Sequence, residues 1–577
     1  GKAVEASSTE MTFQPTVPFD YTKEEPACSE DDEIAKDVWD IYCSGRILQS
    51  VNYHKIFPDS KTFVDMPMKF TANETNKKFD AKFNESTPIQ DINKQELEKF
   101  IKDNFEQEGH ELRSCTPVDW KEKPDKILAI KNETLRNWAL HLHGIWKDLC
   151  KEMKPEVRDM QSRNSLIYVD QPFIVPGGRF REFYYWDAYW IVKGLLVSEM
   201  YTSVRNMLEN LGSMIKRIGF IPNGGRVYYL KRSQPPLFCG MVYEYYKETK
   251  NMTFVQQMLP LMEKEQAFWN EERTVTVTTP EGQNYTVYQY RANSNVPRPE
   301  SYKEDVNTAK EAAAVKDEDR RRFHQNIASA AESGWDFSTR WFRDHKQLKT
   351  IETLNILPAD LNAFQCWNID IIRRLYKKAG NEAKAKEYEE KLKTFHKAME
   401  AVFYNNTEGS WFDMNMRTKS HNTHYYLSNA APLFTRCFST TGDDKALRVY
   451  AKMKAEGAFD HPYGIPTSSE NSGQQWDFPN AWPNLNHLAI EALRNSGSAD
   501  MEEQAFVLAE KWLQGNYRVY SKNETMWEKY HVDDGREGGG GEYNPQVGFG
   551  WTNGAVLDLL HNFNERLYND QHQKEEE

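Results

Sequence analysis

Apolar residues recur at helical spacing along most of this chain, and that period limits the possible folds more than any other feature. The clearest example lies between residues 196 and 215, where apolar positions stand three or four apart and Gly219 follows as a stop signal. The same period marks residues 252–272, 306–331, 360–379, 381–403, 499–514 and 554–568. A convincing strand pair occurs only near 274–291, where TVTVTT and YTVYQYR alternate around PEGQ. The chain is therefore expected to be mainly α-helical with a small β-hairpin insertion.

Six segments that combine aromatic and polar residues interrupt the helices at intervals of about one helix pair. They lie near residues 176–190, 220–236, 291–302, 332–342, 474–484 and 526–554. Antiparallel helix hairpins place every second loop at the same end of a helical assembly. A ring of such hairpins would therefore gather all six segments at one mouth.

The segment PGGRFREFYYWDAYW, residues 176–190, contains seven aromatic rings and four charged groups. Charged groups are costly to bury without partners, and a large exposed ring area is unusual on a plain surface. Sugars match this mixture, because rings cover their C–H faces while charged and amide groups bind their hydroxyls. The alternative is an Arg–Glu–Asp network that braces helix ends against an aromatic core. Composition alone leaves both interpretations open.

Hydrolysis of a glycosidic bond requires two carboxyl groups, one to protonate the leaving oxygen and one to activate water or attack the sugar. Asp336 follows Gly334 and Trp335, where burial beside a ring would raise its pKa as an acid requires. Glu528 and Glu542 flank a run of four glycines at 538–541. The chemistry of the sequence alone does not rank the six candidate carboxylates, Asp187, Glu332, Asp336, Asp477, Glu528 and Glu542.

The glycine run is not a phosphate cradle, because no GK[ST] follows it and no G-x-G-x-x-G opens a helix after a strand. Its composition favours a mobile lid over a site, which would bring Glu542 to a ligand and exclude water. A plain surface linker is the alternative.

The charge balance argues against two classes of partner. The 577 residues carry a formal net charge of −13, so neither nucleic acid nor an anionic membrane surface is expected. No run of about 20 apolar residues occurs, so no membrane span is expected in this chain. The histidine pairs His141/His143 and His421/His424 have no clear third ligand, so no metal and no cofactor are expected.

Seven cysteines are spread along the chain without a CxxC pair. This pattern indicates neither a disulfide framework nor a zinc site, and the odd number leaves at least one thiol unpaired or intermolecular. The positions are Cys28, Cys43, Cys115, Cys150, Cys239, Cys366 and Cys437.

Seven Asn-X-Ser/Thr sequons favour a secretory route with N-linked glycans, and hence a secreted, extracellular protein. A membrane-anchored parent form stays open as an alternative. The sequons are at Asn73, Asn84, Asn132, Asn251, Asn284, Asn405 and Asn523.

The first 120 residues are more polar and irregular than the rest of the chain. They are predicted to form an N-terminal extension, 1–120, packed on a catalytic body that spans 121–577. Within the extension, CSEDDEIAKDVWDIYCSGRILQS (28–50) is the most probable helix by pattern, and the final DQHQKEEE (570–577) is expected to be a frayed tail.

The long motifs resemble those of a known family. PGGRFREFYYWDAYW and QWDFPNAWPN closely resemble the two signature segments of the trehalases of glycoside hydrolase family 37. The segments GFIPNGG, YYLKRSQPP, RPESY, ESGWDFSTRW and EKY…GGGGEYNPQVGFGWTNG are similar to the same family in the same order. The resemblance covers about residues 120–565, and the sequons are similar to those of animal enzymes, particularly insect ones. It implies an (α/α)6 toroid that splits the disaccharide α,α-trehalose into two glucoses by an inverting mechanism.

The resemblance also implies roles for individual residues. Carried over position by position, Asp336 is the general acid and Glu528 is the general base that activates water. Arg179, Arg232 and Arg298 match essential arginines that line the sugar sites. The remaining implied ligand contacts are Trp186, Asp187, Asn223, Gln234, Glu300, Gly334, the ring wall Trp476 and the lid glutamate Glu542.

Two other functions stay open at this point. One is an inverting α-glucosidase that acts on another α-linked glucoside, such as a maltosaccharide. The other is a sugar-binding or sensing protein that has lost catalysis, although binding alone would need neither Asp336 nor Glu528.

Overall fold

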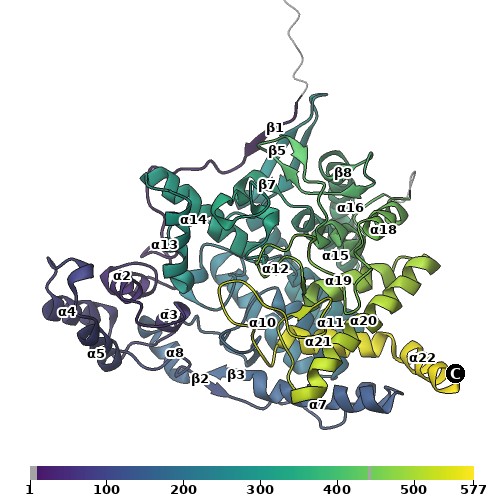
Figure 1. The fold of residues 1–577 in the computed structure, drawn as a ribbon, viewed down its shortest axis with the longest axis horizontal. Coiled ribbons are helices and arrows are strands. Elements are labelled where there is room, and N and C mark those ends of the chain that lie inside the picture. The colour runs from purple at the N-terminus through teal and green to yellow at the C-terminus, as the bar shows by residue number, and fades with distance from the viewer. Residues whose placement is uncertain (1–9, 440–443) are drawn as a thin grey trace, which may run out of the picture.

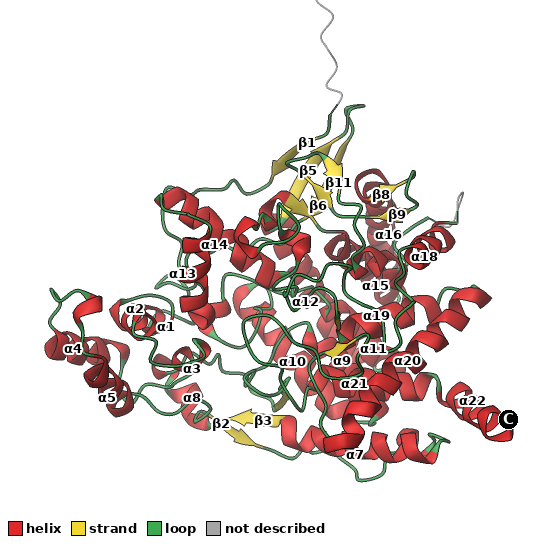
Figure 2. Ribbon diagram, viewed as in Figure 1, coloured by secondary structure: helices red, strands yellow, loops and turns green. Residues whose placement is uncertain are grey.

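Helices make up most of the molecule in the computed structural model, which describes residues 10–439 and 444–577 (Figures 1 and 2). In this described part the strands are short and form five small sheets. The apolar side chains of all elements join one continuous core that runs from Ala27 to Leu567.

Among the described residues, six helices follow one another around a closed ring, each packed against the next. They are α9 (Asp187–Val197), α11 (Phe238–Thr249), α15 (Ala359–Lys378), α17 (Ala431–Thr435), α19 (Pro483–Arg494) and α21 (Gly550–Asn562). The ring closes where α21 meets α9. Helices α9 and α21 are buried almost all round, which explains why their sequences DAYWIVKGLLV and GWTNGAVLDLL are apolar on every face.

A second layer of helices surrounds this ring and alternates with it along the chain. Five of the outer helices pack directly on ring helices: α7 (Glu133–Leu149), α10 (Tyr201–Ile218), α12 (Met252–Glu272), α16 (Glu382–Ala398) and α20 (Ala499–Asn523). The sixth, α18 (Lys445–Ala455), packs against β9 (Ser410–Trp411). This arrangement is the expected (α/α)6 toroid.

Closure of the ring depends on close approach of two backbones. A Cβ atom at Gly554 of α21 would stand 1.9 Å from the carbonyl oxygen of Trp190 in α9. No other residue type fits this position without separating the two helices, because packed interiors leave no room for an added methyl group.

The six aromatic and polar segments all precede inner helices. Residues 176–186 lead into α9, residues 220–236 into α11, residues 474–482 into α19 and residues 526–549 into α21. The segments 291–302 and 332–342 both lie in the long connection between α12 and α15. Because the inner helices all follow outer ones, these connections reach the same end of the toroid.

The N-terminal residues are joined to the body through strands. β1 (Thr12–Pro15) pairs with β5 (Thr274–Thr278), which forms the predicted hairpin with β6 (Asn284–Tyr288). β2 (Leu112–Ser114) pairs with β3 (Cys150–Met153), and β3 pairs with β4 (Phe173–Ile174). Residues on both sides of position 120 therefore share one sheet. The division at residue 120 stays a prediction.

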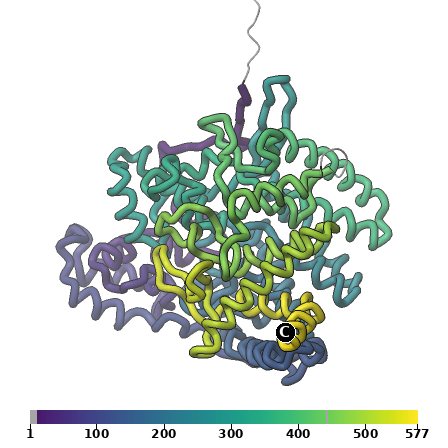
Figure 3. Tube along the Cα trace, turned by 45° about the vertical axis from the view of Figure 1, so that its right-hand side comes forward, coloured from purple at the N-terminus to yellow at the C-terminus, as the bar shows by residue number. Residues whose placement is uncertain are grey.

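Two helices of the extension project from the rest. α4 (Ala72–Phe83) and α5 (Lys94–Asn104) lie at the edge of the molecule, on the left in Figure 1. The C-terminal helix α22 (Asn564–Glu576) lies beside the start of α7 (Figure 3), where the Lys131 N–H donates to Asn564 Oδ1 at 2.8 Å.

Several helix boundaries differ from the sequence predictions. Residues 306–331 form two helices, α13 (Tyr302–Glu311) and α14 (Asp317–Glu332), because Ala313 takes a positive φ of 53°. Residues 28–50 hold only the short helices α1 (Trp39–Tyr42) and α2 (Arg46–Tyr53), separated at Gly45 with φ 105°.

The predicted helix 554–568 is likewise divided, between α21 and α22 at Phe563. The predicted frayed tail is wrong up to Glu576, since α22 continues through it as an exposed helix supported by an ion pair from Lys574 to Asp570.

The interpretation of the cysteines as lacking a disulfide framework was wrong. Three disulfides are present, Cys28–Cys43, Cys115–Cys150 and Cys366–Cys437, and Cys239 is a free, buried thiol. The partners are 15 to 71 residues apart, so only the fold brings them together. The odd number does leave one thiol unpaired.

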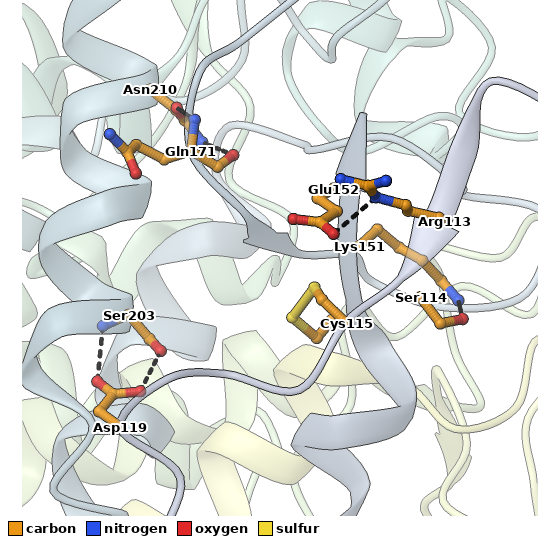
Figure 4. The surroundings of a disulfide bond; sticks show 10 residues. Arg113, Ser114, Cys115, Asp119, Lys151, Glu152, Gln171, Ser203 and Asn210 are labelled. Atoms are coloured by element: carbon orange, nitrogen blue, oxygen red, sulfur yellow. Dashed lines mark hydrogen bonds and ion pairs between the residues drawn. A yellow bond between two sulfur atoms is a disulfide. The ribbon is translucent and has the colours of Figure 1, made fainter. Parts of the chain in front are cut away.

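The Cys115–Cys150 disulfide lies where the extension meets the body (Figure 4). Close by, Asp119 accepts two hydrogen bonds from Ser203 of α10, from its N–H at 2.8 Å and its hydroxyl at 2.6 Å. The polypeptide around residue 115 is thereby fixed to both β3 and α10.

None of the helices in residues 10–439 and 444–577 combines the length and the apolar character that a membrane crossing requires.

Candidate active site

One cavity lies at the mouth of the toroid, with an empty volume of about 670 Å³. Its lining includes all thirteen residues to which the resemblance assigned a role and draws on all six aromatic and polar segments. Those thirteen are Arg179, Trp186, Asp187, Asn223, Arg232, Gln234, Arg298, Glu300, Gly334, Asp336, Trp476, Glu528 and Glu542.

Asp336 stands in the turn that follows α14. Its main-chain carbonyl accepts a hydrogen bond from Gln475 Nε2 at 2.7 Å, which fixes the turn against the 473–480 loop. Scarcity of water around the carboxyl group raises the pKa of Asp336 to about 7, although the nearby charge of Arg298 opposes the rise. This carboxyl group therefore keeps its proton over a pH range in which an ordinary aspartate is ionised.

The turn before Asp336 requires glycine for two reasons. Gly334 has a φ of 76°, in the left-handed region that side chains disfavour. A Cβ atom there would also stand 2.4 Å from Cζ2 of Trp186. The ring of Trp186 and the acid-bearing turn can touch only because this position has no side chain.

Glu528 is buried, with 2% of its surface exposed, and each of its carboxylate oxygens has a donor. Lys529 Nζ contacts Oε1 at 2.7 Å, and the Tyr543 hydroxyl donates to Oε2 at 2.8 Å. The Glu528 N–H donates to the Gln546 carbonyl at 2.9 Å, and its carbonyl accepts from Trp551 Nε1 at 3.1 Å. Both the main chain and the carboxylate are thus held in place.

Asp187, the first residue of α9, contributes a third carboxyl group to the cavity. Within the described part of the chain, no other residue donates a hydrogen bond to it. Burial, followed by the charges of Glu528 and Asp336, raises the pKa of Asp187 well above its usual range. Asp187, Asp336 and Glu528 therefore converge on a cavity that Glu300 and Glu542 also line.

Each of the three arginines in the cavity is held by a carboxylate. Arg179 forms a forked pair with Asp59, from Nε at 2.8 Å and Nη2 at 3.0 Å. Arg298 forms a similar fork with Asp305, at 3.0 and 2.7 Å. Forked pairs fix the plane of a guanidinium group as well as its position.

The third arginine, Arg232, contacts Glu300 through Nη2 and donates from Nε to Asn223 Oδ1 at 3.2 Å. Arg298 also reaches Glu542 in the glycine-rich segment, from Nη2 to Oε1 at 3.0 Å. Burial raises the pKa of Glu542 while Arg298 opposes the rise.

Stacked rings form one wall. Trp476 lies parallel to Trp482, with ring centroids 3.6 Å apart and 4° between their planes. Trp186 packs against Trp476 at 5.7 Å and against Trp551 at 5.8 Å. Flat apolar faces next to fixed cations and carboxylates are the surroundings that a sugar ring requires.

Two of the six candidate carboxylates lie outside the cavity and have structural partners. Glu332 is fully buried and paired with Arg273 at 2.9 Å. Asp477 is fully buried and accepts hydrogen bonds from Ser338, Thr339, Ser468 and Ser472. These two groups brace the turns around the site instead of facing a ligand.

Two clusters among the described residues have the composition of a metal site. In one, Cys366 and Cys437 form a disulfide. In the other, His487 already uses both ring nitrogens, with Trp190 Nε1 at 3.2 Å and Asp558 Oδ2 at 2.6 Å. Neither cluster lines the cavity.

Several residues that shape the site were missed by sequence reasoning. Asp59 and Asp305 orient arginines, and Lys529, Tyr543 and Gln475 surround the two main carboxylates. Lys529 Nζ donates to Gln475 Oε1 at 3.0 Å, so Gln475 connects the Glu528 ion pair to the Asp336 turn. Lys529 and Tyr543 do lie within the motifs EKY and GEY, but Asp59 is 120 residues away from Arg179.

A toroid of helix hairpins with paired carboxyl groups, arginines and stacked rings at its mouth defines a glycoside hydrolase of the (α/α)6 class. The family model Trehalase matches residues 55–564. The chain therefore belongs to the trehalase family.

Proteins named trehalase are similar to nearly the whole chain. The one from Oryctolagus cuniculus is 42% identical over 91% of this chain and 90% of its own length. The one from Apis mellifera is 41% identical over 92% of this chain and 84% of its own. The one from Homo sapiens is 42% identical over 92% of this chain and 90% of its own.

A solved structure has a similar fold. The neutral trehalase Nth1 from Saccharomyces cerevisiae superposes with a TM-score of 0.55 over 69% of this chain and 74% of its own, at 22% identity.

Proposed function

We propose that this protein hydrolyses α,α-trehalose to two molecules of glucose by an inverting reaction. The proposal rests on one observation above all: Asp336 and Glu528 line the same cavity in different surroundings. Burial raises the pKa of Asp336, whereas each carboxylate oxygen of Glu528 has a donor. It is supported by the similarity of nearly the whole chain to proteins named trehalase.

Asp336 acts as the general acid. It is protonated near neutral pH because its pKa is about 7, and it gives this proton to the glycosidic oxygen as the bond to the anomeric carbon breaks. The departing glucose therefore leaves as a neutral molecule.

Glu528 acts as the general base. It accepts a proton from a water molecule, whose oxygen bonds to the anomeric carbon on the face opposite the leaving group. The configuration at that carbon inverts, so the products are one α-glucose and one β-glucose. The buried Lys529 ammonium group forms an ion pair with Glu528 at 2.7 Å, which fixes one carboxylate oxygen.

The remaining predicted residues bind the two sugar rings. Arg179, Arg232 and Arg298 offer fixed guanidinium groups to hydroxyls, and Trp186 and Trp476 cover C–H faces. Further hydrogen bonds to the sugar hydroxyls come from Asp187, Asn223, Gln234, Glu300 and Glu542. Gly334 has no side chain and so leaves room for the ring of Trp186.

We also propose that the protein is secreted and carries N-linked glycans. The sequon residues Asn73, Asn84, Asn284 and Asn523 are exposed, so an attached glycan would meet no packed surface. Three disulfides support an oxidising compartment, because such bonds are rare in the cytosol.

The reaction is tested by following the glucose anomers with proton NMR from the first minutes after trehalose is added. Equal amounts of α- and β-glucose are expected. Formation of α-glucose alone would indicate retention and contradict the roles of Asp336 and Glu528. Maltose serves as the comparison substrate, and faster hydrolysis of maltose would favour an α-glucosidase.

Asp336→Asn and Glu528→Gln are each expected to reduce kcat by about 10²- to 10⁴-fold, because each removes one proton-transfer step. Asp370→Asn is a suitable control, since this carboxylate lies on α15 in a surface cluster with Arg373 and Arg374. Steady-state kinetics with circular dichroism spectra would check the prediction. Near-wild-type turnover in either site variant would remove that residue from its role.

The pH profile should have a basic limb near neutrality. The pKa of Asp336 is raised to about 7, so the group is protonated below that pH and loses its proton as the pH rises through it. An acid must hold its proton to act, and kcat/KM should therefore fall above about pH 7. A profile that stays flat far into the alkaline range would contradict this assignment.

Protein secreted from eukaryotic cells should lose mass when treated with a peptide N-glycosidase, with deamidation at the exposed sequons detected by peptide mass spectrometry. Mapping without reduction should recover the three disulfide-linked peptide pairs. Unmodified sequons and six free thiols at those cysteines would contradict the secretory proposal.

A further inference from the structure

The glycine-rich segment is held against the 473–480 loop by hydrogen bonds. Asn480 Nδ2 donates to the Gly539 carbonyl at 2.7 Å, and the Gly539 N–H donates to Asn480 Oδ1 at 3.3 Å. The Gly538 N–H donates to the Lys529 carbonyl at 2.9 Å. The segment is therefore fixed to the 473–480 loop on one side and to the residues after Glu528 on the other.

Tyr543, two residues beyond the glycine run, is placed over Glu528 by this arrangement. Its hydroxyl donates to Glu528 Oε2 at 2.8 Å. Two cations face its ring, with the Arg179 guanidinium carbon 4.7 Å and Lys529 Nζ 5.1 Å from the ring centroid. Phe180 meets the ring edge to face at 5.5 Å. These contacts fix the ring, and with it the direction of the hydroxyl.

The hydroxyl remains a donor throughout the neutral range. Burial, followed by the charges of Glu528 and Asp336, raises the pKa of Tyr543 well above its usual value, while Arg179 opposes the rise. The charged and titratable groups that face Glu528 are Lys529, Tyr543 and Asp187, and those that face Tyr543 are Glu528, Asp336, Arg179 and Lys529.

We infer that Tyr543 is a positioning residue for Glu528, holding its carboxylate in the orientation that accepts a proton from the attacking water. The inference deepens the proposed function, since it rests on Glu528 as the general base. Lys529 occupies Oε1 and Tyr543 occupies Oε2, so the two donors fix the plane of the carboxylate. Each oxygen keeps a second lone pair for the water.

The arrangement also makes the glycine-rich segment part of the chemistry. This segment supplies Glu542 to Arg298 on one side of the cavity and Tyr543 to Glu528 on the other. The base is therefore fully supported only when the segment lies against the 473–480 loop.

Tyr543→Phe tests the inference because it removes the hydroxyl and keeps the ring between its two cations. Loss of a hydrogen bond to a charged group should lower kcat about tenfold or more. KM should change little, because the ring and Glu542 remain.

Tyr388→Phe is the matched control. Tyr388 on α16 is also a buried tyrosine, and its hydroxyl donates to Oε1 of Glu263 at 2.8 Å. Neither residue lines the cavity. This variant should keep both the wild-type kcat and the wild-type pH profile. Thermal unfolding of both variants separates loss of stability from loss of activity.

A double variant tests whether Tyr543 acts through Glu528. Combined with Glu528→Gln, the Tyr543→Phe change should reduce the residual rate no further, because residues that act as one unit are not additive. Independent, multiplying losses would overturn the inference, as would a loss in Tyr543→Phe that appears in KM and leaves kcat at the wild-type value.

The two proposals fail in different ways. If wild-type protein releases no glucose from trehalose, or if Glu528→Gln is fully active, the proposed function fails. If wild-type protein is active, Glu528→Gln is inactive and Tyr543→Phe matches the wild type, only the role of Tyr543 fails.

Discussion

Contact between the first and last inner helices is the constraint on which the rest of the structure depends. α9 and α21 meet backbone to backbone at Gly554 and Trp190, although more than half of the chain separates them. The residues that lead into α9 carry Arg179 and Trp186, and those that lead into α21 carry Glu528 and Glu542. A wider contact at this seam would move these two sets of residues apart, because each set lies in the segment that leads into its helix.

Partners, more than burial, decide what each carboxyl group in this region can do. Glu332 and Asp477 are as deeply buried as Glu528, but an arginine or a set of hydroxyls satisfies them completely. Asp336 opens on the cavity and has too little compensation for its charge, so its pKa is raised to about 7. Glu528 has a lysine and a tyrosine at its two oxygens. The same chemical group is thus a partnered brace at Glu332 and Asp477, and is proposed as the acid at Asp336 and as the base at Glu528.

Features with a local cause could be predicted from the sequence. Helical periods located the outer helices α10, α12, α16 and α20 and the ring helices α15 and α21, but they did not locate the ring helices α9, α11, α17 and α19. Alternation located the 274–291 hairpin, and the long motifs named thirteen residues that line one cavity. Features that depend on distant contacts could not be predicted. The three disulfides, the fork from Asp59 to Arg179 and the bridge from Gln475 to Lys529 join segments that no local pattern relates. The helix break near Ala313 was also missed, although the seven residues that follow Val315 are all charged and interrupt the apolar period.

The position of Arg179 has a consequence for how the molecule is made. Its guanidinium group is held by Asp59, near the beginning of the chain, and its main-chain N–H donates to Gln546, near the end. During synthesis on the ribosome, the first of these contacts can form early, but the second must wait until almost the whole polypeptide has emerged. A nascent chain that stops short of residue 546 therefore has no finished cavity. Premature release would yield an inactive product instead of a partly active one.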